Sequence, residues 1–103
     1  MNEEKILQAV CDYFHEDITK VKSPSQKDNY VKMRHIAIYF MDKKLDITER
    51  LMGKCFTGRS LKGSGGMNHS TVIHALKTVR NQIETDKFYA SNIEALDKII
   101  SAL

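Results

Sequence analysis

Apolar residues recur three and four positions apart along most of the chain, with polar residues between them. In the first such stretch, Ile6, Leu7 and Val10 share one side of a helix with Tyr13 and Phe14. No segment alternates between apolar and polar residues with period two. The pattern therefore predicts an all-α domain, a compact bundle of five to six helices.

The same spacing predicts where each helix begins and ends. Helices are predicted over residues 3–14, 31–44, 47–56 and 68–84, with a last helix starting at Asp86. Asp17 is expected to cap a short turn of helix through Val21, and the polar stretch 22–29 is predicted to be a loop. The inward positions predicted for the third helix are Met33, Ile36, Ala37, Phe40 and Met41, and those for the last helix are Phe88, Ile93, Leu96, Ile99, Ile100 and Leu103.

Residues 58–67 are rich in glycine, with four glycines in ten positions, and predict a mobile loop. Glycine-rich segments can also bind phosphate groups. This one lacks the GxxxxGK[ST] spacing and follows a predicted helix, not a strand, which disfavours nucleotide binding.

With 103 residues, the chain has the length of one domain, residues 1–103. It has no apolar run near the roughly 20 residues that span a bilayer, and no basic-then-apolar leader. Cys11 and Cys55 lie on apolar helix faces without CxxC spacing, so we expect buried free thiols and a cytoplasmic location.

Charge is distributed unevenly along the chain. Residues 1–19 contain five acidic residues and one lysine, and residues 83–103 contain four acidic residues and two lysines. The middle segment, residues 20–82, therefore carries a net charge of +9. Such a split is typical of a surface that binds phosphates, although a lysine-rich solvated face has the same composition.

No pattern in the chain indicates catalysis. His69 and His74 are five residues apart and point in different directions on one helix, so they do not form a metal-binding pair. Neither cysteine has a neighbouring histidine, and no pair of carboxylates stands out. We expect a protein that is not an enzyme, with no cofactor, no metal, no small-molecule substrate and no membrane partner.

The segment from Asn68 to Leu76 is the most informative one. A capping residue opens it, short polar side chains fill the first turn, and an apolar stripe (Val72, Leu76, Val79, Ile83) follows on the other side. Together with residues 47–56 it forms a predicted helix-turn-helix, about residues 47–84, whose second helix would enter the major groove of DNA. Taken alone, the segment fits an ordinary amphipathic core helix better.

Four motifs resemble the C-terminal DNA-binding domain of the bacterial replication initiator DnaA. ILQAVCDYF (residues 6–14) is similar to the opening of that domain, VKMRHIAIY (31–39) to its "RPRQIAMYL" helix, and MGKCFTGR (52–59) to "IGxxFGGR". NHSTVIHA (68–75) resembles the signature "DHSTVxHA". The motifs occur in the family's order between residue 5 and about residue 84.

The resemblance implies a Trp-repressor-like helical fold that binds double-stranded DNA in replication initiation or its regulation, in the bacterial cytoplasm and nucleoid. It implies that His69, Ser70 and Thr71 face the major groove and that Arg34 and His35 lie at the backbone or groove edge. Arg80 is expected near phosphates, one turn beyond Lys77. The full expected DNA interface is Arg34, His35, Lys43, Lys44, Lys54, Arg59, Lys62, Asn68, His69, Ser70, Thr71, His74 and Lys77.

The chain also departs from the family. The loop before the third helix, residues 23–28, has no arginine where the family has an arginine-rich loop, and Asn68 replaces an acidic residue. The turn between Arg59 and Asn68 is longer by roughly seven to eight residues, and the family's ATPase module is absent from the sequence. We expect relaxed reading of the family's binding site, with Arg59 and Lys62 either replacing the lost contacts or lying in a tolerated insertion.

Two functions therefore remain open. The first is DNA binding without ATPase activity, with other replication or regulatory proteins as additional partners. The alternative is a protein-interaction module on the same scaffold with a decayed DNA face. Basic residues that converge beside residues 69–71 would favour DNA, and a dominant exposed apolar patch would favour a protein partner.

Overall fold

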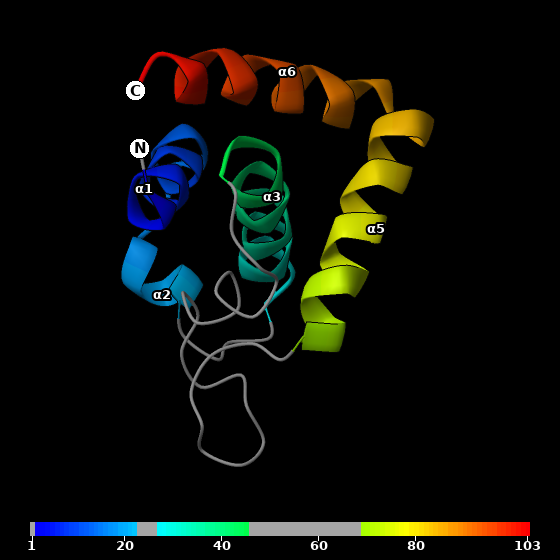
Figure 1. Cartoon of the computed structure of the whole chain (residues 1–103), viewed down its shortest axis with the longest axis horizontal. Coiled ribbons are helices and arrows are strands. Elements are labelled where there is room, and N and C mark those ends of the chain that lie inside the picture. Colours follow the sequence, from blue (N-terminus) through cyan, green and yellow to red (C-terminus); the bar gives the residue numbers. More distant parts are fainter. Residues whose placement is uncertain (1, 23–26, 46–68) are drawn as a thin grey trace.

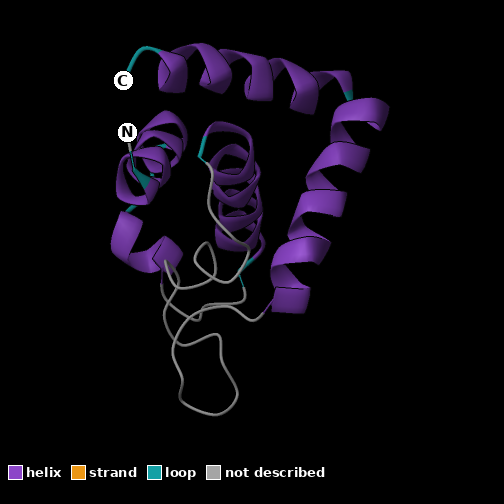
Figure 2. Ribbon diagram, viewed as in Figure 1, coloured by secondary structure: helices purple, strands orange, loops and turns teal. Residues whose placement is uncertain are grey.

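The computed structural model describes residues 2–22, 27–45 and 69–103, and these form five helices and no strand. The helices are α1 (Glu3–Phe14), α2 (Ile18–Lys22), α3 (Asp28–Lys44), α5 (His69–Thr85) and α6 (Lys87–Ser101). Figures 1 and 2 show α3 between α1 and α5, with α6 crossing one end of all three. The predicted all-α fold is confirmed. The predicted helix 47–56 and glycine-rich loop 58–67 lie outside the described residues.

Capping residues mark both ends of α1 and the start of α6, at the positions that the sequence predicts. Asn2 Oδ1 accepts a hydrogen bond from the backbone N–H of Lys5 at 2.9 Å and starts α1. His15 ends the same helix in the left-handed conformation, with φ 58°. Asp86 Oδ1 accepts from the N–H groups of Phe88 and Tyr89, so α6 begins directly after α5.

α3 begins three residues earlier than predicted, at Asp28 instead of Val31. Its first turn is polar and largely exposed, so no apolar stripe marks it in the sequence. The N–H of Val31 donates to the carbonyl oxygen of Lys27 at 3.0 Å, which places that turn in the helix. Asp28 in the first turn also interacts favourably with the positive end of the helix dipole.

A single hydrophobic core joins the five helices, and α3 contributes the largest share. All five inward positions predicted for α3 are buried, and Cys11 is a buried free thiol as expected. Burial of its thiol raises the pKa of Cys11 to about 11, since the charged thiolate is disfavoured away from water, and nearby carboxylates act in the same direction. Among the described residues, no helix is long and apolar enough to cross a bilayer.

Half of the apolar stripe predicted for α6 is not in the core. Ile93, Leu96 and Ile100 are buried, but Phe88 is 76% exposed, Leu103 56% and Ile99 43%. Tyr89, which the pattern did not select, is 5% exposed and packs in the core instead. The apolar residues of α6 occupy a wider part of the helix surface than the other described helices cover. Only the residues on one side of this apolar surface are therefore buried.

Candidate nucleic-acid interface

α5 is anchored by its apolar side and presents polar side chains on the other. Val72, Ala75, Leu76 and Val79 are buried, and Ile83 is partly buried against the same core. This confirms the stripe predicted for the helix. His74, Lys77 and Arg80 of the same helix are exposed.

The first turn of α5 begins at His69, which places the backbone of His69 and Ser70 at the helix start. Thr71 follows, half-buried at the edge of the core. The first N–H groups of a helix have no partner within it and carry partial positive charge, so this end suits a phosphate or a base edge. Among the described residues, the turn lies at the end opposite α6 in Figure 1.

His35 of α3 meets His74 of α5 at the side of this helix. Their rings pack edge to face, with centroids 6.3 Å apart and an interplanar angle of 85°. The hydroxyl of Thr78 donates to the carbonyl oxygen of His74 at 2.9 Å and lies 3.5 Å from Nε2 of the same residue. The structure therefore brings the predicted residues His35 and His74 together, a pairing that the spacing of the sequence did not indicate.

A cavity of about 370 Å³ opens beside His35. It lies between α3, α5 and the start of α6, and its lining includes Lys32, His35, Thr78 and Asp86. The ammonium group of Lys32 lies 5.7 Å from the ring centroid of Phe14 and 5.5 Å from that of Tyr89, so part of its charge is held over aromatic faces. In the described residues, no group of three or more His, Cys, Asp and Glu side chains could hold a metal ion.

The prediction that Arg34 lies at the DNA backbone or groove edge needs correction. Arg34 is 1% exposed, and its Nε donates a hydrogen bond to the carbonyl oxygen of Val21. The residue lies on the inward side of α3, one position after Met33 and two before Ile36, both of which are buried. Its guanidinium group therefore stabilises the contact between α2 and α3 and is not presented to a duplex.

Lys44 also lies away from the first turn of α5. Its ammonium group forms an ion pair with Asp97 at 2.8 Å and donates to the Ser101 hydroxyl at 2.9 Å, both on the C-terminal half of α6. Lys43 precedes it at the same end of α3, with its ammonium 5.7 Å from the ring centroid of Tyr39. The Lys44 side chain therefore joins α3 to α6, and its contact with DNA stays a prediction.

Arg80, expected near phosphates, pairs with an acidic residue. One of its guanidinium nitrogens lies 3.3 Å from a carboxylate oxygen of Asp42 on α3. The pair is exposed, so its attraction is weak and screened by salt. Lys77, one turn earlier, is the exposed lysine nearest in sequence to the first turn.

Four of the predicted site residues, Lys54, Arg59, Lys62 and Asn68, lie outside the described residues. Among the described residues expected to converge beside residues 69–71, Lys77 and Arg80 are exposed on α5, and the His35 and His74 rings pack together at this helix.

Comparisons with known proteins agree with the helical arrangement. A family model described as "Bacterial dnaA protein helix-turn-helix" matches residues 3–79. The chain is 34% identical over 100 residues to the chromosomal replication initiator protein DnaA of Chlorobaculum tepidum, covering 97% of this chain and 19% of that protein. It is 33% identical over 100 residues to the protein of the same name from Wolbachia pipientis wMel, with 93% and 19% covered. The corresponding protein of Bacteroides thetaiotaomicron is 29% identical over 97 residues, with 94% and 19% covered.

Proposed function

The chain belongs to the bacterial DnaA helix-turn-helix family, and on that premise we propose that it binds double-stranded DNA with α5 as its recognition helix. The chain spans 19% of the length of the relatives it matches. The proposal for these residues is non-enzymatic DNA binding in replication initiation or its regulation, without ATP hydrolysis.

The observation that supports the proposal most directly is how α5 packs against the rest of the domain. Its apolar side is buried from Val72 to Val79, while its first turn lies at one end of the described part of the molecule. A helix held this way can enter the major groove without losing its core contacts. The proposed base contacts come from His69, Ser70 and Thr71, and the proposed phosphate contacts come from Lys77 and the first N–H groups.

The remaining proposed contacts are of two kinds. His74 on α5 and His35, which packs against it from α3, are proposed to lie beside the duplex. Lys54, Arg59, Lys62 and Asn68 are proposed from the sequence alone. Arg59 and Lys62 either contact phosphates or the minor groove, or belong to a neutral insertion. Deletion of residues 60–66 separates these cases, because loss of phosphate contacts lowers both the affinity and its salt dependence.

Fluorescence anisotropy with labelled duplexes tests the main proposal. Random duplexes and duplexes carrying initiator-type sites are titrated at several salt concentrations. We expect binding that weakens steeply with salt, and a loss of about 1–3 kcal/mol in site preference for Thr71→Ala. Lys98→Ala is the matched control, because Lys98 is an exposed residue on α6. No binding to any duplex at low salt would refute the proposal.

A second candidate function is docking of a protein partner. The exposed apolar side chains of Phe88 and Ile99 on α6, and of Leu103 just after it, favour it. In Figure 1, α6 lies at the opposite end of the molecule from the first turn of α5, so a protein contact there is compatible with DNA binding by α5.

A further inference from the structure

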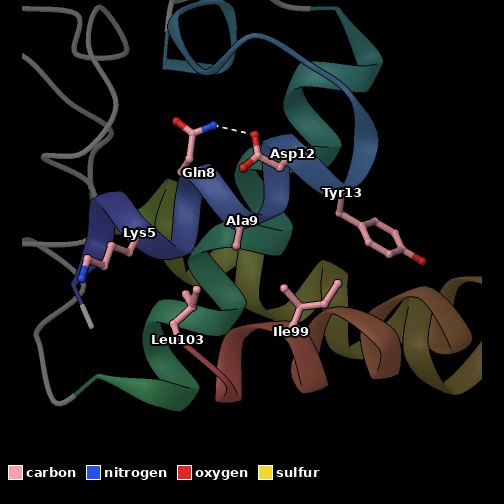
Figure 3. Close-up of a pocket in the computed structure, with 7 residues that line it drawn as sticks. All are labelled: Lys5, Gln8, Ala9, Asp12, Tyr13, Ile99 and Leu103. Atoms are coloured by element: carbon pink, nitrogen blue, oxygen red, sulfur yellow. Dashed lines mark hydrogen bonds between the residues drawn. The ribbon is translucent and has the colours of Figure 1, made fainter.

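An apolar groove of about 530 Å³ runs between α1 and α6 (Figure 3). Its lining consists of Lys5, Gln8, Ala9, Asp12, Tyr13, Ile99 and Leu103. α1 packs against α2, α3 and α6, and α5 packs against α3 and α6. In Figure 1, α1 and the C-terminal end of α6 lie on the other side of α3 from α5, so the groove lies away from the recognition helix.

The centre of the groove is apolar. Ile99 of α6 and Leu103, which follows α6, project toward Ala9 of α1 in Figure 3, and they are among the large apolar side chains left exposed on the described surface. Exposed apolar side chains that adjoin one another on a small domain mark a contact surface more often than isolated ones do. Ala9 forms the floor of the groove and is itself 8% exposed.

Two opposite charges lie on the same α1 surface. Lys5 and Asp12 are seven residues apart, which places them on one face of the helix and about 10 Å apart along its axis. Both side chains are exposed. Gln8 Nε2 donates to Asp12 Oδ1 at 2.7 Å, which holds one oxygen of the carboxylate and leaves the other for a second donor.

We propose that a second copy of this chain occupies the groove. When two α1 helices pack antiparallel about a twofold axis between Gln8 and Ala9, Lys5 of each copy lies opposite Asp12 of the other. The surface is therefore complementary to itself, as a twofold interface requires. Ile99 and Leu103 of both copies flank the axis and lose contact with water.

The proposed dimer has two recognition helices. Because the groove lies away from the first turn of α5, each copy keeps its own α5 available, and one dimer can hold two DNA sites. This consequence rests on the proposed DNA-binding function. The association itself does not, and it is measured without DNA, so either proposal can fail alone.

Sedimentation velocity of the full chain, from micromolar to millimolar concentration, provides the test. We expect a reversible equilibrium between the 11.8 kDa monomer and a dimer of twice that mass, with the dimer fraction rising with concentration. Lys5→Glu and Asp12→Lys each place like charges opposite one another, and each should weaken association at least about tenfold. The double variant should restore it, and an equimolar mixture of the two single variants should form a heterodimer.

Matched controls use exposed residues outside the groove lining. Lys98→Glu and Glu94→Lys make the same charge changes on α6 and should leave association unchanged. Ile99→Ser should weaken association, whereas Phe88→Ser, at a more exposed position outside the lining, should not. Circular dichroism checks that each variant is folded. A monomer at every concentration, a dimer insensitive to the single reversals, or a double variant that stays monomeric would each overturn the proposal.

Discussion

The Nε of Arg34 donates a hydrogen bond to the main-chain carbonyl oxygen of Val21, and this contact joins α3 to the short helix α2. Both residues are buried. α2 has only five residues and one fully buried apolar side chain, and this hydrogen bond adds a polar contact to its packing on α3. A residue that resembles a DNA contact in the family motif thus acts in the interior of this chain.

Arg34→Met tests this role because methionine keeps most of the side-chain volume and removes the donors. We expect the free energy of unfolding to fall by about 1–3 kcal/mol, since a buried carbonyl oxygen loses its partner. Urea denaturation measures the change. Lys77→Met, at an exposed position, should change stability by less than about 0.5 kcal/mol. Unchanged stability of Arg34→Met together with weaker DNA binding would instead mean that Arg34 turns toward the duplex.

Lys77→Ala should reduce the salt dependence of DNA binding. If Lys77 contacts one phosphate, the slope of log K against log salt should become less steep by about one. Random and site-bearing duplexes should lose affinity equally, because a phosphate contact carries no sequence information. A slope equal to that of the wild type would place Lys77 outside the interface.

Stability should fall at alkaline pH because of Cys11. Its pKa is about 11 in the folded chain against an ordinary value of 9.0, so the stabilisation is complete below pH 9 and is lost as the pH rises through 11. Between pH 8 and pH 10.5 this loss amounts to about 2 kcal/mol. Urea denaturation of Cys11→Ala over the same range should show a correspondingly smaller pH dependence. Parallel pH profiles of the two proteins would contradict the assignment.

Asp97 should make stability depend on pH in the acid range. Its hydrogen bond to Lys44 holds the pKa of the carboxyl below its usual value of 3.8. The ion pair therefore contributes fully above that pH, and its contribution is lost as the pH falls through the lowered pKa. Asp97→Asn should be slightly less stable than wild type near pH 7, by up to about 1 kcal/mol. The difference should vanish at low pH, whereas Glu94→Gln should show no such convergence.

The sequence predicts helices correctly where an apolar stripe or a capping side chain marks them. It predicts α1 with both of its ends, and it places Asp86 correctly as the start of the last helix. The prediction for α3 is three residues short because the first turn carries no apolar marker. These outcomes depend on local physics, since helical spacing and side-chain capping involve residues a few positions apart.

The pattern of residues by itself determined the all-α class, the buried side of α5 and the family motifs around His69 to Thr71. Only the tertiary structure decided that Arg34 is interior, that Lys44 binds Asp97, that His35 meets His74, and that Ile99 and Leu103 stay exposed. The physical reason is that periodicity shows which residues share one side of a helix. How much of that side is covered, and which charges meet, depends on helices distant in sequence.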